Sequence, residues 1–321
     1  MRLPPYLIVI LLLSACGSAF VPAQGAGGLY QDGGIFKPAV EMIATARSRA
    51  LVEMYEFGRT DLERGLVAAR LRGADVRVVL DPTIPISVVV GRRLAAAGVP
   101  VRFYPVDDSL GQIDHVKLLL GDSSGLVGGM NWGVGSARNH DFALLLRGVG
   151  KLERLKQIFE QDWSLAGGVP RPLAPVVEPL AQTAPGTEIR GLLEAVLDAA
   201  RRHIDAEVFA LTDPEVILRL QTAHRRGVEV RVILDRAQVV NLPAFTALRR
   251  SGAGVRWATP VGAGAKLHAK AVLADGRLVL GSANWSRHGL EINHELDVAT
   301  EDSRAVAAYS ARFEADWRAA A

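Results

Sequence analysis

Two copies of one polar pattern, about 150 residues apart, contain the side chains best suited to chemistry. The first copy places His115, Lys117 and Asp122 at the spacing His-x-Lys-x4-Asp, and an Asn follows nine positions later. The second copy repeats this spacing with an equivalent set of side chains, namely His268, Lys270, Asp275 and Asn284. Imidazole donates or accepts a proton near neutral pH, whereas ammonium and carboxamide groups bind anionic oxygen. Each copy therefore suits proton transfer beside a negative charge.

The spacing of each copy predicts a strand that ends at one edge of a sheet. Side chains alternate across a strand, so His115 and Lys117 share one face while Val116 and Leu118 point into the core. A turn and a second apolar strand then return the chain, which brings Asn131 to the same end of the sheet. Packing alone does not explain why this set occurs twice. We therefore prefer a catalytic interpretation to one of two structural histidines.

The two copies, followed by Gly-Gly-x-Asn and Gly-Ser-x-Asn, resemble the motifs of the phospholipase D superfamily. This superfamily includes phospholipases D, cardiolipin synthases, metal-independent endonucleases and tyrosyl-DNA phosphodiesterases. The resemblance covers both halves of the chain, roughly residues 35 to 318. In one departure, the first copy has Gly129 where the second has Ser282. A hydroxyl beside the phosphate is therefore expected from one side only.

The resemblance implies a phosphodiesterase that works through a covalent phosphohistidine. His115 is the implied nucleophile, and His268 is the implied general acid, which protonates the leaving alkoxide and then activates water. Asp122 and Asp275 complete the catalytic motifs, where we expect them to hold geometry rather than touch substrate. The groups expected to bind the phosphate, where negative charge must be held, are Lys117, Lys270, Asn131, Asn284, Ser282 and Gly129.

A second repeated pattern, Asn-His-Asp or Asn-His-Glu, precedes an apolar segment in each half. In members of the resembling family a carboxylate at this place orients the catalytic imidazole, which makes Asp141 and Glu295 the candidates. The alternative is that both carboxylates lie on solvated faces. Glu53 and Glu207 also occupy matching places, either beside the site or in ordinary ion pairs.

The repetition extends beyond the motifs, because residues 72–81 return as residues 226–235. A period this long indicates a duplicated domain. Strands alternating with helices predict α/β halves at 35–163 and 189–321, each a sheet covered on both faces. Between them, residues 164–188 contain five prolines and are predicted to be an extended linker. The resemblance adds a pseudo-twofold axis with the active site at the seam, in a monomer with two internal halves.

The N-terminus resembles a bacterial lipoprotein signal peptide over residues 1–16. Its apolar run at residues 6–13 is shorter than the roughly 20 residues that span a membrane. The run ends at Leu-Ser-Ala-Cys, in which Cys16 would become the lipidated first residue. Residues 17–34 are Gly-rich and predict a flexible tether. We therefore expect an exported protein that is lipid-anchored to the periplasmic or extracellular face of the cell envelope.

Composition and charge are consistent with a folded protein but do not identify its substrate. The chain is 49% hydrophobic with a formal charge of +3, which suits a folded protein but is too small to indicate an anionic partner. No Cys/His cluster or acidic metal loop is present in the sequence, so no cofactor or metal is expected. Hydrolysis of phospholipids at a membrane surface, giving phosphatidic acid and headgroup, is our first hypothesis. The alternatives are an endonuclease acting on DNA or RNA, transfer of the cardiolipin synthase type, and a non-catalytic binding protein.

Overall fold

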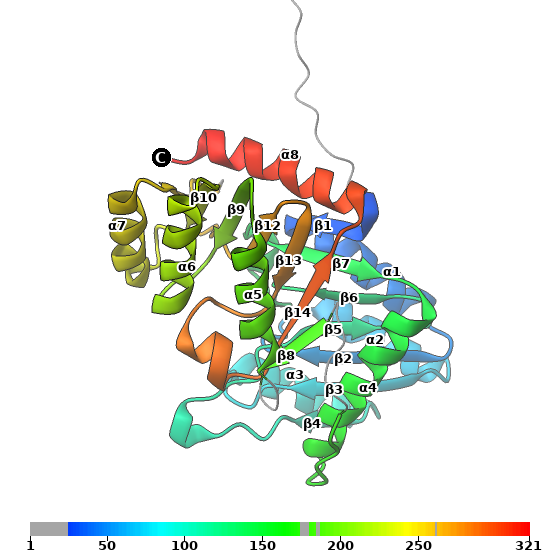
Figure 1. Cartoon of the computed structure of the whole chain (residues 1–321). Coiled ribbons are helices and arrows are strands. Elements are labelled where there is room, and N and C mark those ends of the chain that lie inside the picture. Colours follow the sequence, from blue (N-terminus) through cyan, green and yellow to red (C-terminus); the bar gives the residue numbers. More distant parts are fainter. Residues whose placement is uncertain (1–24, 174–179, 184–186, 261) are drawn as a thin grey trace, which may run out of the picture.

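The computed structural model describes residues 25–173, 180–183, 187–260 and 262–321, and it contains two seven-stranded mixed sheets, one from each half (Figure 1). This confirms the predicted two-halved α/β fold. The expected signal peptide and Cys16 lie outside the described residues. The described helices are all too short or too polar to span a bilayer.

The first sheet has a parallel part and an antiparallel part. Strands β2, β3 and β4 are parallel, and the strands on the other side of β2 are antiparallel. Its strands run in the order β1 (Leu29–Gln31), β7 (Phe142–Leu146), β6 (Gly125–Gly128), β5 (Lys117–Leu120), β2 (Arg49–Met54), β3 (Asp75–Leu80) and β4 (Val101–Phe103). The helices of this half are α1 (Phe36–Thr45), α2 (Thr60–Leu71), α3 (Pro85–Ala96) and α4 (Val149–Leu165).

The second sheet repeats this topology strand for strand. Its order is β11 (Gly254–Trp257), β10 (Glu229–Leu234), β9 (His203–Val208), β12 (Lys270–Ala274), β13 (Arg277–Gly281), β14 (Glu295–Thr300) and β8 (Leu180–Thr183). The helices are α5 (Glu188–Ala199), α6 (Pro214–Arg225), α7 (Leu242–Ser251) and α8 (Ser303–Ala319). Helices α6 and α8 begin after Asp213 and Asp302, whose carboxylates accept hydrogen bonds from N–H groups of the first turn.

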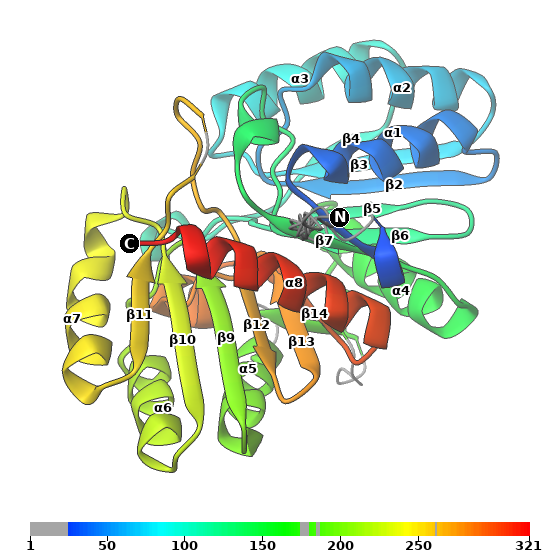
Figure 2. The same ribbon diagram turned by 90° about the horizontal axis from the view of Figure 1, so that it is seen from above.

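A shared apolar core joins the two halves. It contains side chains from the inner faces of both sheets together with those of α4 and α8, including Leu155, Phe159, Tyr309 and Phe313. Figure 2 shows α8 between the two sheets, with α1 to α3 and α5 to α7 on the outer faces. Burial of this much apolar surface between the halves fixes their relative position.

Two segments have more structure than their composition predicts. Residues 29–31 of the expected tether form β1, which pairs with β7, and residues 180–183 of the expected linker form β8, which pairs with β14. Both strands are short and follow Gly-rich or Pro-rich stretches, so local propensity does not reveal them. They form because β7 and β14 would otherwise leave backbone N–H and C=O groups unpaired.

Candidate active site

Each motif histidine lies at the seam between the halves, next to residues of the opposite half. Each precedes its motif strand by two residues, because β5 and β12 begin at the motif lysines. The His115 N–H donates to the His294 carbonyl, and the His268 N–H donates to the His140 carbonyl, both at 2.8 Å. The chain segments that hold the imidazoles are thus hydrogen-bonded across the pseudo-twofold axis.

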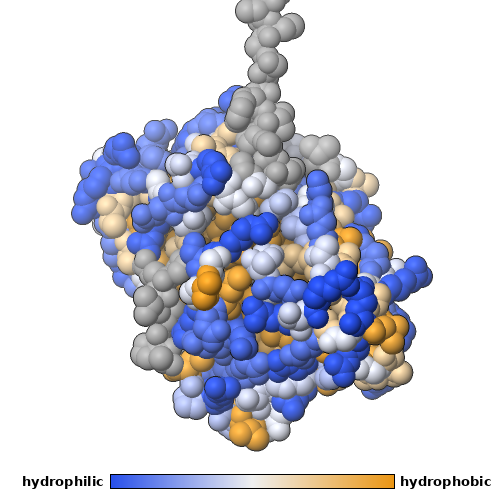
Figure 3. All heavy atoms as spheres, turned by 90° about the vertical axis from the view of Figure 1, so that its right-hand side faces the viewer, coloured by the Kyte–Doolittle hydropathy of each residue, from blue (hydrophilic) through white to orange (hydrophobic). Residues whose placement is uncertain are grey.

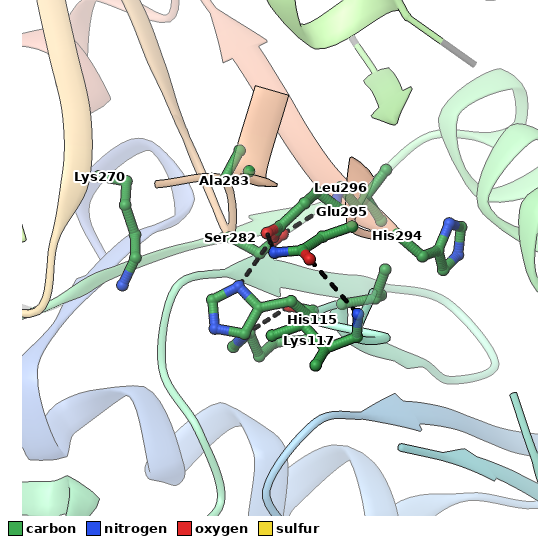
Figure 4. Close-up of polar contacts among 12 residues, drawn as sticks. His115, Lys117, Lys270, Ser282, Ala283, His294, Glu295 and Leu296 are labelled. Carbon is green, nitrogen blue, oxygen red and sulfur yellow. Dashed lines mark hydrogen bonds and ion pairs between the residues drawn. The ribbon is translucent and has the colours of Figure 1, made fainter. Parts of the chain in front are cut away.

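Each motif imidazole contacts a carboxylate from the opposite half. His115 Nδ1 lies 2.8 Å from Glu295 Oε2, and His268 Nδ1 lies 2.7 Å from Asp141 Oδ2. Figure 4 shows the first of these contacts. Because an ionised carboxylate only accepts, Nδ1–H is the donor, and Nε2 keeps its lone pair in the neutral ring. Both expected orienting carboxylates are therefore beside the histidines, but each acts across the seam.

Burial keeps both imidazoles uncharged in the free protein. It lowers the pKa of His115 to about 4 and that of His268 to about 3, and the adjacent ammonium groups add to the effect. Burial by itself would raise the pKa of Glu295, but His115 and Lys117 outweigh it and lower that pKa. Two neutral imidazoles can act as nucleophile or base at neutral pH.

The motif lysines form the cationic part of the site. Lys117 Nζ donates to the His115 carbonyl at 2.5 Å, and Lys270 Nζ donates to the His268 carbonyl. Their ammonium groups also lie over the rings of Tyr55 and Phe209, at 5.1 Å and 5.0 Å. Burial lowers the pKa of Lys117 to about 7 and that of Lys270 to about 8. An anionic substrate would restore full charge to both.

The two asparagines lie at the same end of the sheets but differ in their partners. Asn131 Nδ2 donates to Glu56 Oε2 at 3.3 Å. The Oδ1 atoms of Asn131 and Asn284 are buried, and neither has a hydrogen-bond partner among the described residues. These amide groups therefore retain hydrogen-bonding capacity for a ligand.

Ser282 contacts Glu295 instead of facing the space between the histidines. Its hydroxyl donates to the Glu295 carboxylate and accepts from the Leu296 N–H at 2.9 Å. At Gly129 there is no room for a serine, because a Cβ would lie 2.3 Å from Asp141 Oδ1. The same Oδ1 accepts from the Phe142 N–H at 2.9 Å. In the first half, Asp141 Oδ1 thus accepts the backbone hydrogen bond that the Ser282 hydroxyl accepts in the second half.

Asp122 and Asp275 lie at the ends of β5 and β12 that are remote from the site. Asp122 accepts hydrogen bonds from the N–H groups of residues 47–49, and Asp275 accepts from those of residues 201–203. Five residues of extended chain separate Asp122 from Lys117, or roughly 17 Å. The two carboxylates therefore fix the starts of β2 and β9 and do not reach a substrate at the histidines.

Sequence reasoning missed the histidines that precede the orienting carboxylates. His140 contacts Glu207, and His294 contacts Glu53, in buried clusters behind the motif imidazoles. Glu53 and Glu207 therefore belong to ion pairs and do not touch His115 or His268. The repeated Asn-His-Asp and Asn-His-Glu patterns contained this signal, but only their carboxylates had an evident role.

Curated relatives match part of this chain. A curated relative, the mitochondrial cardiolipin hydrolase of Homo sapiens, is 35% identical over 128 residues, which are 39% of this chain and 49% of that protein. The chain thus spans about half the length of this relative. The protein of the same name from Xenopus laevis is 33% identical over 152 residues, which are 45% of this chain and 70% of that protein.

A solved structure and a family profile extend the likeness to both halves. The phosphatidylserine synthase of Haemophilus influenzae superposes with a TM-score of 0.70 over 93% of this chain and 87% of that chain, at 12% identity, which shows the fold alone. A family profile described as "Cardiolipin synthase, PLD-like domain" matches residues 39–163 and 193–317. The chain therefore belongs to this PLD-like family of the phospholipase D superfamily.

Proposed function

We propose that this protein is a phosphodiesterase that hydrolyses membrane phospholipids to phosphatidic acid and free headgroup. The observation that supports this most strongly is the pair of imidazoles, each fixed at Nδ1 by a carboxylate of the other half. This arrangement leaves both Nε2 atoms without a carboxylate partner among the described residues, and Lys270 Nζ lies 3.2 Å from His268 Nε2. Phosphodiester cleavage in two displacements uses this set of groups.

In the first displacement, His115 Nε2 attacks phosphorus. The new P–N bond forms as the bond to the headgroup oxygen breaks, and that oxygen takes the proton from His268 Nε2. The substrate's negative charge and the Asp141 carboxylate both favour the imidazolium form of His268, which burial disfavours in the free protein. Lys117 and Lys270 stabilise the charge that develops on the non-bridging oxygens.

In the second displacement, water attacks the phosphohistidine. His268, now neutral, accepts a proton from the water, and the P–N bond breaks as phosphatidic acid is released. His115 returns to its neutral form, with Nδ1–H still held by Glu295. The two histidines must be in opposite protonation states at each step, so one motif alone would not complete the cycle.

Exposed apolar side chains around the site favour a lipid substrate. Seven of the twelve large apolar side chains that are exposed in the described residues lie at the motif end of the sheets, on loops or at helix starts. We call these residues the apolar rim: Ile86, Val89, Leu110, Val134, Val239, Val240 and Leu242. By contrast, the face in Figure 3 is mostly hydrophilic, with small separate apolar patches.

The apolar rim flanks the site from both halves. Ile86 and Val240 begin equivalent helical segments after β3 and β10. A Cβ at Gly58 would lie 3.4 Å from both Ile86 and Val134, so these two side chains converge. An apolar rim gains free energy in the acyl region of a bilayer, whereas nucleic-acid binding depends mainly on many Lys/Arg contacts with phosphate.

The test compares lipid and nucleic-acid turnover at equal enzyme concentration. We expect headgroup release from mixed phospholipid vesicles and no nicking of plasmid DNA. Replacing Val239 and Val240 with Ser should lower vesicle turnover about tenfold, and more than turnover of a dissolved aryl phosphodiester. Leu71→Ser, at the remote end of α2, is the matched control and should match the wild type. Robust nicking without phosphatidic acid would replace this proposal with a nuclease.

The membrane location of the protein is a separate proposal based on its N-terminal sequence. Lipidation at Cys16 would keep the site close to its substrate and raise the effective substrate concentration. Cys16→Ser should abolish acyl labelling and shift the protein from the membrane fraction to the soluble fraction. An intact wild-type protein that carries no acyl label would contradict lipid anchoring.

A further inference from the structure

Four ionisable side chains form a sealed cluster directly behind the nucleophile. Glu53, Asp114 and Asp162 come from the first half, and His294 comes from the second. We call them the first seam cluster. Each has a relative exposure of 0%, and the ring of Tyr104 stacks on His294 with 4.5 Å between the centroids. Three carboxylates and one imidazole are thus shielded from solvent together.

Five of the six carboxylate oxygens in the first seam cluster have no hydrogen-bond partner among the described residues, and the sixth, Asp114 Oδ1, accepts from the Val116 N–H at 3.3 Å. Both oxygens of Glu53, both of Asp162 and Oδ2 of Asp114 accept no hydrogen bond within the described residues. His294 Nε2 lies 3.4 Å from Glu53 Oε1 and 3.2 Å from Asp162 Oδ2. Glu53, Asp114 and His294 each offer one atom, and these atoms all lie within 4.8 Å of one another. Buried carboxylate oxygens in such number must be balanced by a positive charge or by bound protons.

The equivalent cluster in the second half contains that counter-charge. There Arg312 donates to Asp32 and to Asp316, both at 2.6 Å, and His140 contacts Glu207. Three carboxylates therefore face two cations. In the first half the position of Arg312, four residues before the helix carboxylate, is taken by the buried Ile158. Three carboxylates there face one imidazole, so the first seam cluster is short of one positive group.

We propose that the first seam cluster binds one divalent cation of the zinc or manganese class. Three carboxylates with one imidazole form a mixed oxygen and nitrogen donor set suited to these ions. The 3.2 Å and 3.4 Å separations match the roughly 3.3 Å edges of a tetrahedron with bonds of about 2.0 Å. His294 Nδ1 lies 3.2 Å from the Thr183 carbonyl, which directs Nε2 toward the carboxylates.

The ion would have a structural role. It would tie a histidine of the second half to three carboxylates of the first, one residue from Glu295, which holds the nucleophile. Because the site is closed, the ion would not meet the substrate. The competing explanation is that protons balance the cluster, since burial raises the pKa of Asp114 to about 7 and that of Glu53 well above its usual value.

The experiment measures metal content and thermal unfolding on the full chain, grown with added Zn²⁺ and Mn²⁺. We expect about one equivalent of metal per chain by mass spectrometry, and a Tm that falls by several degrees on metal removal and recovers with Zn²⁺ or Mn²⁺. Asp114→Leu introduces the residue at the equivalent position of the second half, Leu267, and should abolish binding. Glu207→Gln, in the other cluster, is the matched control and should retain the metal.

A second variant keeps the test decisive if Asp114→Leu does not fold. Ile158→Arg supplies the guanidinium that the second half has at this place, so it should fold without metal, with a Tm that no longer responds to Zn²⁺. A folded wild-type chain with less than about a tenth of an equivalent of metal, and no rise in Tm with either ion, would favour protons and overturn the proposal. Metal retained in both variants would overturn it too.

Discussion

The two half-sites both place an imidazole against a carboxylate of the opposite half but hold their carboxylates differently. Glu295, which contacts the proposed nucleophile His115, also accepts hydrogen bonds from Asn293 Nδ2 at 3.1 Å and from the Ser282 hydroxyl. Asp141, which contacts His268, accepts in addition only the Phe142 N–H among the contacts resolved in the described residues. The more restrained carboxylate is therefore on the side that would form the covalent intermediate.

The two halves also differ in how they accommodate these carboxylates. A carboxylate one methylene shorter lies closer to its own backbone, at the place of the Ser282 side chain. Gly129 accommodates Asp141 there, and Asp141 takes over the hydrogen bond from the following N–H. Positions 129 and 141 thus differ from positions 282 and 295 in a complementary way, because Asp141 Oδ1 occupies the space that a side chain at position 129 would need.

The largest expected effect comes from removing either imidazole. His115→Ala should abolish both turnover and the covalent adduct, because no other group there can attack phosphorus. His268→Ala should lose about 10³-fold on alkyl phosphodiesters but much less on an activated aryl substrate, which needs little proton donation. The test measures turnover of both variants on the alkyl and aryl substrates and traps the labelled covalent adduct. Phosphate trapped on His268 would reverse the two roles.

Neutralising either of the carboxylates that contact the histidines should lower kcat about 100-fold, and the two variants should differ in their dependence on the leaving group. Asp141→Asn acts through His268, the proposed proton donor. The decrease in kcat of this variant should therefore be smaller when an aryl leaving group replaces an alkyl one. Glu295→Gln acts through His115, so its loss should be the same for both substrates. Steady-state kcat for the two variants on the two substrates tests this. Equal leaving-group dependence would show that the half-sites are not specialised.

Much of this arrangement can be read from the sequence, and the rest depends on long-range contacts. The duplicated motifs identify both imidazoles and both lysines, because period-two alternation fixes their faces. The crossing of Glu295 to His115 is not encoded locally, since it follows from how the halves pack. Likewise the role of Ser282 follows from the length of the carboxylate beside it, and β8 exists because β14 needs a partner.

Restoring the second half's arrangement in the first should test the complementary fit of positions 129 and 141. Gly129→Ser alone should lower kcat about tenfold, because the new Cβ would lie 2.3 Å from Asp141 Oδ1 and displace the carboxylate. Gly129→Ser combined with Asp141→Glu should recover most of the loss. A double-mutant cycle in kcat measures the coupling. Additive losses would show that the two positions are independent.

The smallest effect separates the two lysines by pH. A lysine carries its charge below its pKa, and burial lowers that pKa to about 7 for Lys117 and about 8 for Lys270 in the free protein. Because kcat/KM reports the free enzyme, in which both lysines must be protonated, it should fall about 2.5-fold between pH 7 and pH 7.5, while kcat persists to higher pH as the bound phosphate retains both charges. Arginine stays charged throughout this range. Lys117→Arg should therefore remove the decrease in kcat/KM near pH 7, and Lys270→Arg should remove the decrease near pH 8. A wild-type kcat/KM that stays level to pH 9 would mean that both ammonium groups remain protonated in the free site, and that the two half-sites do not differ in the charge they present to phosphate.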